Sequence, residues 1–467
     1  LFLTDGRVGS IVGTDTIRNG TFFFKRNVGE SGMDQLSLMC RDTDFPPMSL
    51  DIYATPGAKI KVTGTNPLIY TWRVDSPVKE QQEHNRFIED SRDLWDEFQR
   101  LAIKERSMRS ASETERKALR TKSDSISSII NQRELKLMKE LPISNVWMEK
   151  LLRLSMSLKY NSRFTNKEEI LALYDRLNEE QKASIEGQEI RVNLFPPKTV
   201  KEGDDMADAD LFDLDGKVHH LADFKGKYML LDFWSSGCGP CIMALPEMKE
   251  IQEQYKDRLT IISLSSDTQT RWKAASTQHE MTWQNLSDLK QTAGLYAVYD
   301  VNGIPNYVLI SPKGKIVKMW SGYGKGSLKL KMRRYLDAPK REMSITGDTN
   351  RKVVNYPSFE STNTDILEVK QVELTDTATI VHFYAYYIPK YWIQVSVNAK
   401  LVDEQGTSYT LQKADGITPG KHFFLPESGE AEFSLTFKPL PLKTKSFNFT
   451  EGTAKNDWQI NGIKLTR

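Results

Sequence analysis

The chain has few cysteines and no long hydrophobic run. Three of its 467 residues are cysteine, which is too few for a fold held together by disulfides. Cys40 stands alone and is interpreted as a buried strand thiol. No segment approaches the roughly 18 consecutive apolar residues of a membrane span, so we expect a soluble chain. The sequence begins at Leu1 without a methionine or a basic leader, and we expect that a targeting segment was removed in front of it.

An excess of charge of one sign is also missing. Lysine and arginine total 64 against 62 acidic residues, which leaves a net charge of +2. This balance provides no overall field that would draw the chain to nucleic acid or to an anionic membrane. We therefore expect no nucleic-acid partner.

The length of the chain, and the change from strand patterns to helical patterns and back along it, predict a multidomain α+β protein. Residues 1–76 are rich in strand and turn signals, which predicts a small antiparallel β domain with strands in "TFFFKRNV", "LDIYATPGAKIKVTGTN" and "LIYTWRV". Residues 77–193 carry apolar side chains at helical spacing among many charges, which predicts a helical region. Residues 341–467 return to alternating patterns such as "TATIVHFYAYY", which predict a β-sandwich-like domain.

Residues 198–340 alternate between strand and helix patterns and therefore predict an α/β domain. "LFDLDGKVHHL" predicts a hairpin with its turn at Asp215 and Gly216. "KYMLLDFW" and "LTIISLSS" predict buried strands, and "ALPEMKEIQEQY" between them predicts a helix. The double proline of "LFPPKTV" marks a linker in front of this domain.

The other two cysteines, Cys238 and Cys241, form a Cys-x-x-Cys where a predicted strand gives way to a predicted helix. Free N–H groups and the dipole at a helix start favour a thiolate, so we expect the pKa of Cys238 to fall below the roughly 8.5 of a free thiol. Cys241 follows one turn later, close enough to resolve a mixed disulfide on Cys238. Between them lie Gly239 and Pro240, and the proline presets the first helical turn and so fixes the spacing of the sulfurs.

Two residues at the end of the predicted strand belong to the same candidate site. Asp232 lies six residues before Cys238, where a buried carboxylate would accept or return the proton of Cys241, and burial should raise its pKa. A hydrogen-bonded core acid is the alternative interpretation of Asp232. Trp234 is expected to cover the flank of the site.

A Gly-Ile-Pro segment, residues 303–305, precedes another predicted buried strand. A cis Pro305 would lie against the sulfurs and leave the main chain of Ile304 to pair with an extended substrate segment. A simple proline at a strand entry is the alternative interpretation.

Two other interpretations of the cysteine pair are weaker. A structural disulfide across so short a loop gains little from restricting the unfolded chain. A zinc site needs two more ligands, and the neighbouring His219 and His220 are interpreted as a solvated pair on the hairpin. We therefore expect no metal and no cofactor beyond the redox-active pair itself.

These motifs resemble a thioredoxin domain over residues from about 198 to 340. The matching features are W-x-x-x-C-G-P-C, the aspartate six residues before the first cysteine, Pro246 five residues after the second, and G-I-P before the later strand. The lead-in "DLDGKVHHLADFKGKYMLLDFW" and "LISPKGKIVKMW" narrow the resemblance to the TlpA/ResA-like branch of extracytoplasmic bacterial thiol-disulfide oxidoreductases. Residues 1 to about 192 are similar to the β domain plus helical segment placed before such thioredoxins in multidomain envelope proteins.

Two positions depart from the family pattern. Many members of the branch have a glutamate three residues after the second cysteine, where this chain has Ala244. The lysine that thioredoxin places near its buried aspartate has no counterpart here either. Asp232 would then serve as the acid of the site.

The resemblance implies a disulfide reductase or exchanger for partner proteins, with a reducing potential on the order of −270 mV. Its implied catalytic residues are Cys238, Cys241, Asp232 and Pro305, and its implied substrate-binding residues are Trp234, Gly239, Pro240 and Ile304. It also implies a periplasmic or cell-envelope location, a disulfide-containing client and a membrane-bound electron donor. A thiol peroxidase, and a binding or assembly protein acting through its β domains, are the alternatives. The flanking domains would serve to place a client or to form a homodimer.

Overall fold

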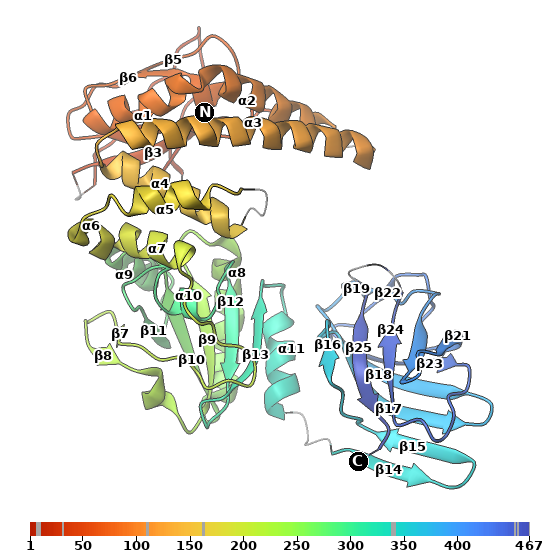
Figure 1. The fold of residues 1–467 in the computed structure, drawn as a ribbon. Helices are drawn as coiled ribbons and strands as arrows, with labels where there is room; N and C mark the ends of the chain where they lie inside the picture. Colours follow the sequence, from red (N-terminus) through yellow and green to blue (C-terminus); the bar gives the residue numbers. More distant parts are fainter. Residues whose placement is uncertain are drawn as a thin grey trace. The chain divides into compact units, whose positions relative to one another are not determined.

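The structure is a computed structural model that describes residues 1–5, 11–29, 32–108, 112–160, 164–337, 342–452, 454 and 457–466. The chain divides into two compact units, residues 1–239 with 262–320, and residues 240–261 with 321–467. Along the chain, Figure 1 shows strands, then helices, then a mixed α/β layer and then a second set of strands. This order confirms the multidomain α+β class. The predicted boundary between residues 340 and 341 lies outside the described residues, and the other boundaries stay predictions.

The N-terminal strands form a four-stranded antiparallel sheet in the order β2-β1-β3-β4. These strands are β1 (Phe2–Asp5), β2 (Ile11–Thr14), β3 (Asp34–Met39) and β4 (Leu50–Ala54), while β5 (Lys61–Thr63) pairs separately with β6 (Arg73–Asp75). Alternation along β3 buries Leu36 and Leu38 on one face. The predicted strand in "TFFFKRNV" is wrong. Phe22 and Phe24 pack against this core without strand pairing, and the Phe22 ring stacks on Trp72 at 6.2 Å.

Among the residues that the structure describes here, seven helices follow: α1 (Lys79–Asp90), α2 (Arg92–Ser107), α3 (Glu113–Glu140), α4 (Asn145–Tyr160), α5 (Lys167–Tyr174), α6 (Glu179–Ala183) and α7 (Ile185–Leu194). The long α3 begins with reciprocal capping, since the Ser112 hydroxyl accepts from the Glu115 N–H and the Glu115 carboxylate accepts from the Ser112 N–H. The apolar faces of these helices meet around Trp147, which is fully buried and donates its indole N–H to the Met138 carbonyl at 2.9 Å. The helical spacing in the sequence therefore gives a packed helical core.

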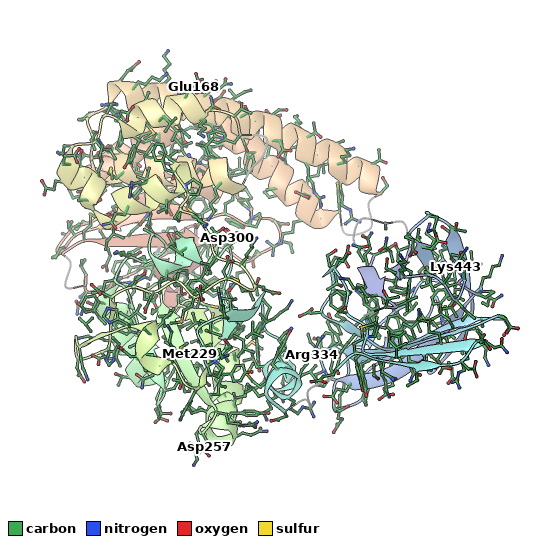
Figure 2. The ribbon with its side chains drawn as sticks, turned by 60° about the horizontal axis from the view of Figure 1, so that its bottom comes forward. Glu168, Met229, Asp257, Asp300, Arg334 and Lys443 are labelled. Atoms are coloured by element: carbon green, nitrogen blue, oxygen red, sulfur yellow. The ribbon has the colours of Figure 1, made fainter. Side chains whose placement is uncertain are left out.

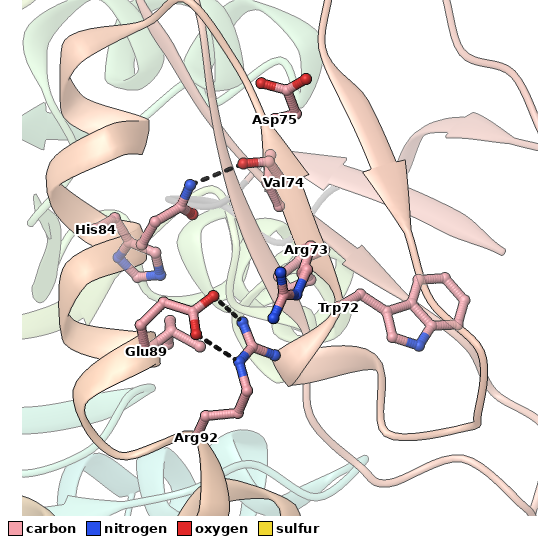
Figure 3. Close-up of a pocket in the computed structure, with 10 residues that line it drawn as sticks. Trp72, Arg73, Val74, Asp75, His84, Glu89 and Arg92 are labelled. Atoms are coloured by element: carbon pink, nitrogen blue, oxygen red, sulfur yellow. Dashed lines mark hydrogen bonds and ion pairs between the residues drawn. The ribbon is translucent and has the colours of Figure 1, made fainter.

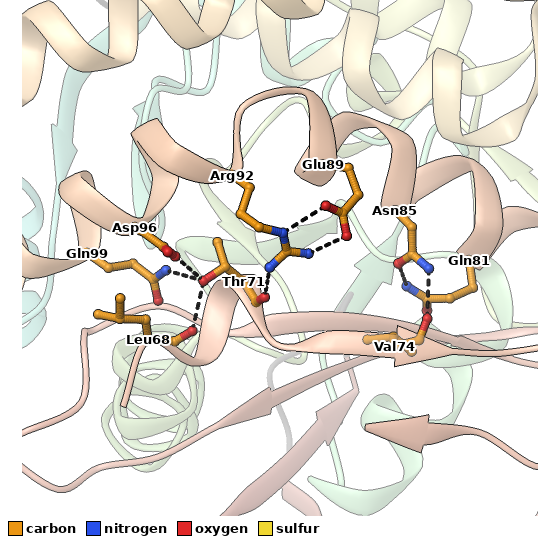
Figure 4. A network of polar contacts seen from close by, with 9 residues as sticks. All are labelled: Leu68, Thr71, Val74, Gln81, Asn85, Glu89, Arg92, Asp96 and Gln99. Atoms are coloured by element: carbon orange, nitrogen blue, oxygen red, sulfur yellow. Dashed lines mark hydrogen bonds and ion pairs between the residues drawn. The ribbon is translucent and has the colours of Figure 1, made fainter. Parts of the chain in front are cut away.

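Polar side chains of α1 and α2 bind the main chain at the edge of the β segment (Figure 4). Asn85 donates to the Val74 carbonyl at 2.7 Å. The Arg92 guanidinium donates to the Thr71 carbonyl and pairs with Glu89 at 2.7 Å. Main-chain carbonyls that face a packed interface need such partners, so the helices complete the β segment.

Besides α8 (Gly239–Tyr255) and a 3-10 turn (Leu221–Phe224), the α/β region contains seven strands and two short helices. They are β7 (Leu211–Phe212), β8 (Val218–His219), β9 (Tyr228–Trp234), β10 (Leu259–Ser265), α9 (Gln269–Gln278), β11 (Gln284–Leu286), α10 (Leu295–Val298), β12 (Asn306–Ile310) and β13 (Ile316–Ser321). β7 and β8 form the predicted hairpin, with Gly216 at a φ of 86° in its turn. The main sheet has the order β11-β10-β9-β12-β13. β9 is buried on both faces, and Met229, which Figure 2 labels within this layer, is fully covered.

The second unit begins with α8 (Gly239–Tyr255), whose buried Glu247 joins it to the start of α11 (Ser327–Met332). The Glu247 carboxylate accepts from the Tyr323 hydroxyl at 2.9 Å and from the Gly326 and Lys329 N–H groups, both at 2.8 Å. A buried carboxylate satisfied by three donors holds two helices together. Among the described residues, no helix has both the length and the apolarity to cross a bilayer.

The last helical turns contact the C-terminal strands. Lys331 pairs with Asp365 at 2.5 Å, and the π-helical turn η3 (Arg333–Asp337) follows α11 directly. The Arg334 guanidinium, labelled in Figure 2, lies 4.5 Å from the ring centre of Tyr386. Each partly exposed contact is worth about 1 kcal/mol or less, and their number rather than any one of them fixes this interface.

The C-terminal strands form one antiparallel sheet of ten strands in the order β14-β15-β17-β18-β23-β21-β20-β24-β25-β16. Their bounds are β14 (Ser344–Gly347), β15 (Arg351–Asn355), β16 (Ser361–Thr362), β17 (Leu367–Thr375), β18 (Thr379–Tyr386), β20 (Lys400–Asp403), β21 (Ser408–Asp415), β23 (Glu430–Phe437), β24 (Ser446–Thr450) and β25 (Gln459–Lys464), with β19 (Trp392–Ile393) and β22 (Phe423–Phe424) paired separately. The strands on the two sides of β21 contribute to one core, as in a sandwich, with Phe383 from β18 packed near Phe449 from β24. These two groups of strands nevertheless form one continuous sheet, because β21 pairs with both β20 and β23.

Candidate active site

The cysteine pair lies where β9 ends and α8 begins, as the sequence predicts. Cys238 directly precedes the helix, its N–H donates to the Ser235 carbonyl at 3.1 Å, and Cys238 and Cys241 are joined as a disulfide. Cys238 is 8% exposed and Cys241 2%, which makes Cys238 the outer of the two sulfurs. Gly239 and Pro240 are exposed in the first turn of α8. The arrangement suits attack at the outer sulfur and resolution by the inner one.

The loop before Cys238 is held by an acidic side chain that the sequence did not reveal. The Asp267 carboxylate accepts from the Ser236 N–H at 2.7 Å and from the Ser236 hydroxyl at 3.0 Å. Asp267 also accepts from the Ser265 hydroxyl at 3.2 Å. Because these bonds come from the end of β10, they tie the cysteine loop to the sheet.

Asp232 is the buried acid of the site. It is 2% exposed on β9, and burial raises its pKa to about 7, while a hydrogen bond from the Ser263 hydroxyl acts in the opposite direction. The Ser263 Oγ lies 2.7 Å from Asp232 Oδ2. The expected upward shift is thus present in the structure. An acid of this pKa exchanges protons near neutral pH, as a proton acceptor for a thiol requires.

Pro305 lies next to the cysteine loop through strand pairing. Asn306 pairs with Phe233 in the antiparallel β9–β12 ladder, so Pro305 comes level with the end of β9. The Ile304–Pro305 peptide bond is cis, as expected. Ile304 is half-buried, and its main chain makes no hydrogen bond to another described residue. The strand register therefore brings the Gly-Ile-Pro segment to the end of the sheet from which the cysteine loop departs.

Trp234, which is expected on the flank of the site, is buried at the end of β9. It is 1% exposed, and its buried indole N–H has no hydrogen-bond partner among the described residues. Little of its side chain is therefore open to a client in this structure, and substrate contact by Trp234 stays a prediction.

Sequence reasoning also missed the hydroxyl groups that organise the site. Ser263 comes from "LTIISLSS", where the run of serines in a buried strand was the available signal. The Tyr296 hydroxyl lies 2.8 Å from the Trp234 carbonyl and 2.9 Å from the Leu264 carbonyl, so it bridges the ends of β9 and β10. Its position 62 residues after Trp234 gave no sequence signal of this contact.

The described part of the chain contains no cluster of three or more histidine, cysteine or acidic side chains arranged to hold a metal ion. His219 and His220 pair with Asp213 at 2.8 Å and Asp210 at 2.9 Å on the hairpin. These contacts engage both histidines away from the sulfurs, in keeping with their interpretation as a surface pair.

A cavity of about 220 Å³ lies in the N-terminal segment (Figure 3), where β6, α1 and α2 meet. Its lining includes Trp72, Arg73, Arg92 and the buried His84, whose pKa burial lowers to about 3. Both ring nitrogens of His84 are covered by protein atoms and have no hydrogen-bond partner among the described residues. A molecule in this cavity does not reach those nitrogens, so we assign the cavity no catalytic role.

A Cys-x-x-Cys at a helix start, a buried aspartate and a cis proline on the neighbouring strand define a thioredoxin-like thiol-disulfide site. Residues 203–319 match the model of the AhpC/TSA family. A thioredoxin-like protein, YneN, from Bacillus subtilis is 31% identical over 121 residues, which are 25% of this chain and 69% of that protein. The thiol-disulfide oxidoreductase ResA from Geobacillus thermodenitrificans is 32% identical over 139 residues, 29% of this chain and 79% of that protein. This chain also matches a crystal structure of the thioredoxin domain of a thiol-disulfide oxidoreductase from Bacteroides vulgatus, with 30% sequence identity and a TM-score of 0.26. The match covers 27% of this chain and 91% of the crystallised chain.

The chain belongs to the thioredoxin-like family of thiol-disulfide oxidoreductases that includes ResA. This confirms the class of enzyme that the motifs predict, a protein-disulfide oxidoreductase. The family match covers residues 203–319, and the β and helical segments on either side lie outside it.

Proposed function

We propose that the protein reduces disulfides in client proteins through Cys238 and Cys241. In the reduced enzyme the Cys238 thiolate attacks one sulfur of the client disulfide, which forms a mixed disulfide and releases one client thiolate. Cys241 then loses its proton and attacks the Cys238 sulfur, which releases the second client thiolate and closes the Cys238–Cys241 bond. Two electrons pass from the enzyme dithiol to the client, and the site needs no further cofactor for this step.

The position of Cys238 in front of α8 supports its choice as the nucleophile. The free N–H groups and the dipole at the start of a 17-residue helix stabilise a negative charge there. Cys238 is also the more exposed of the two sulfurs. Cys241, inside the first turn, supplies the resolving thiol.

Asp232 takes the proton of Cys241 in this proposal. With a pKa of about 7 the acid is substantially ionised at neutral pH, so it accepts a proton in one direction and returns it in the other. Ala244 is fully buried on α8 and carries no carboxyl group, which leaves Asp232 in the acid role. The same enzyme would run in reverse against a strongly reduced client.

Ile304, next to the cis Pro305, supplies the client-binding edge. Its main-chain N–H and carbonyl are without partners among the described residues, and an extended client segment would pair with them as a short added strand. Gly239 and Pro240, both exposed next to Cys238 in the sequence, would contact the same client. Because such pairing recognises main-chain groups, which all clients share, it is compatible with many client sequences.

The cell envelope of a bacterium, or its periplasm, is the proposed location, and a membrane-bound dithiol donor is the proposed source of electrons. Both proposals follow from the resemblance to the TlpA/ResA-like branch, and a reductase outside the cytoplasm must be re-reduced from the membrane. We assign the flanking β domains to the placement of clients or to pairing with a second copy of the chain. Nucleic acid is not a proposed partner, because the net charge is only +2.

One observation carries the proposal: the cysteine pair occupies the start of α8, at the end of a buried strand that also holds Asp232. The test incubates the reduced full chain with a fluorescence-quenched peptide disulfide. Cys238→Ser should abolish reduction, and Cys241→Ser should stop at a mixed disulfide visible by mass spectrometry. Cys40→Ser is the matched control, because Cys40 is a free, buried cysteine outside the site and its loss should leave the rate unchanged.

Reduction that survives Cys238→Ser would contradict the proposal. Consumption of hydrogen peroxide in place of the peptide disulfide would favour a thiol peroxidase. Reaction with neither substrate would favour a binding or assembly protein that acts through its β domains.

A further inference from the structure

A chain of three buried side chains ends at the acid of the site. The Trp283 indole nitrogen lies 2.8 Å from the Ser263 hydroxyl oxygen, and that oxygen lies 2.7 Å from Asp232 Oδ2. Trp283 is 7% exposed, Asp232 2%, and Ser263 is fully covered. The three residues come from three separate segments of the α/β region, so the fold assembles the chain.

In the ionised acid the direction of both hydrogen bonds is fixed by chemistry. An indole N–H donates and never accepts, so the Ser263 oxygen must be the acceptor of the first bond. A carboxylate only accepts, so the Ser263 hydroxyl donates its single proton to Asp232 Oδ2.

This polarity leaves one carboxylate oxygen without a hydrogen bond. With Asp232 Oδ2 engaged by the Ser263 hydroxyl, an incoming proton meets the other oxygen, Oδ1. Asp232 Oδ1 accepts no hydrogen bond from any described residue. It is thus the oxygen left open for proton exchange.

We infer that Ser263 and Trp283 are positioning residues that orient the Asp232 carboxyl group so that its Oδ1 exchanges the proton of the resolving thiol. The inference deepens the proposed reduction of client disulfides and rests on it. Ser263 is the partner of the buried acid, through its hydroxyl. A hydroxyl stabilises the carboxylate through one bond and adds no charge.

Few other groups near Asp232 titrate. The two cysteines do so in the reduced enzyme, and the Tyr307 main chain pairs with that of Asp232 across the strands. Burial raises the pKa of the Tyr296 phenol well above its usual value, and the Asp232 charge raises it further. The shift of Asp232 itself is caused by burial and by the Ser263 bond, with no charged side chain among its causes.

The test follows the Asp232 carboxyl group and the reaction separately. The infrared carbonyl band of the protonated acid, assigned by its loss in Asp232→Asn, gives the titration midpoint in the oxidised protein. Ser263→Ala should raise this midpoint by about one pH unit, because a hydrogen bond to the charged form is lost. The pH midpoint for release of the second peptide thiol should move upward with it.

Trp283→Phe keeps an aromatic ring and removes the donor to Ser263. It should shift both midpoints by a smaller amount, and its effect should vanish in a Ser263→Ala background, as coupling through the hydroxyl demands. Ser287→Ala is the matched control, since that serine is 1% exposed and donates to a main-chain carbonyl, Ser265 O, at 3.2 Å.

An infrared midpoint that does not move in folded Ser263→Ala protein, while the wild type reduces the peptide disulfide, would overturn the inference and leave the proposed function standing. A wild type whose Asp232 titrates as described but which reduces no disulfide would remove the proposed function instead. Should Ser263→Ala fail to fold, Trp283→Phe alone decides, and unchanged midpoints in that variant count against the inference.

Discussion

Replacing Asp232 by asparagine should make the α/β region more stable at alkaline pH. The buried acid has a pKa of about 7 in the folded protein, against 3.8 for the unperturbed group, and burial is the largest cause. Its pKa is therefore raised by about 3 units, and each unit corresponds to about 1.4 kcal/mol. Ionised Asp232 thus costs the folded state up to about 4 kcal/mol relative to a neutral side chain of the same shape.

The sign of the pH dependence follows from proton linkage. A folded state that raises the pKa of an acid binds the proton more tightly than the unfolded chain does. The contribution of Asp232 to stability is therefore complete below about pH 4 and is lost progressively as the pH rises through about 7. Asp232→Asn should show none of this loss, and the two proteins should differ most above pH 8.

Hydrogen exchange measured by mass spectrometry on peptides from β9 gives the local free energy of opening. This readout is preferable to a global melt, because a chain of several cores does not unfold in two states. At pH 3.5 the oxidised wild type and Asp232→Asn should be similar. At pH 8.5 the opening free energy of the variant should be higher by up to about 4 kcal/mol, so that it exchanges more slowly. Equal pH dependence of β9 in the two proteins would refute the argument, since the acid would then not ionise in this range.

Three further predictions concern the groups that hold the site. Asp267→Asn weakens the hydrogen bonds to Ser236, so the amides of the cysteine loop should exchange faster. Reduced Cys238 should then be alkylated several-fold faster, and an unchanged alkylation rate would contradict a restraining role of Asp267. Tyr296→Phe removes the hydroxyl between the carbonyl ends of β9 and β10 and should cost about 1–3 kcal/mol of opening free energy in those strands, measured by hydrogen exchange. Glu247→Ala leaves three donors without their acceptor and should cost about 3 kcal/mol in exchange of the α11 segment, while β9 peptides serve as the internal reference.

Local patterns predicted the parts of the site that lie close together in the sequence. The buried run of β9, the helix after it and the Asp-Gly hairpin each follow from spacing within about ten residues, and the structure has all three. The cis bond before Pro305 and the raised pKa of Asp232 also agree with the expectation from the motif. Short-range patterning carries this much information because it reflects burial and turn geometry directly.

Contacts between distant segments were not predictable in the same way. Ser263 lies 31 residues after Asp232, and Trp283 follows 20 residues later, so no window of sequence contains their bonds. The segment "TFFFKRNV" shows the converse error, because three successive phenylalanines favour a strand by propensity. Two of them, Phe22 and Phe24, pack against the core while the Phe23 N–H donates to the Asp15 carboxylate rather than to a neighbouring strand, and tertiary contacts decide the outcome there.

A serine as the hydrogen-bond partner of the buried acid has a physical consequence. A lysine would oppose the desolvation of the carboxylate with a full positive charge, at the cost of burying a second ion. The Ser263 hydroxyl opposes it with one hydrogen bond, so burial prevails and the pKa of Asp232 stays near 7. The acid of this site therefore has a pKa within the ordinary pH range with no charged side chain among the causes of its shift, and the Ser263 hydrogen bond partly offsets the effect of burial.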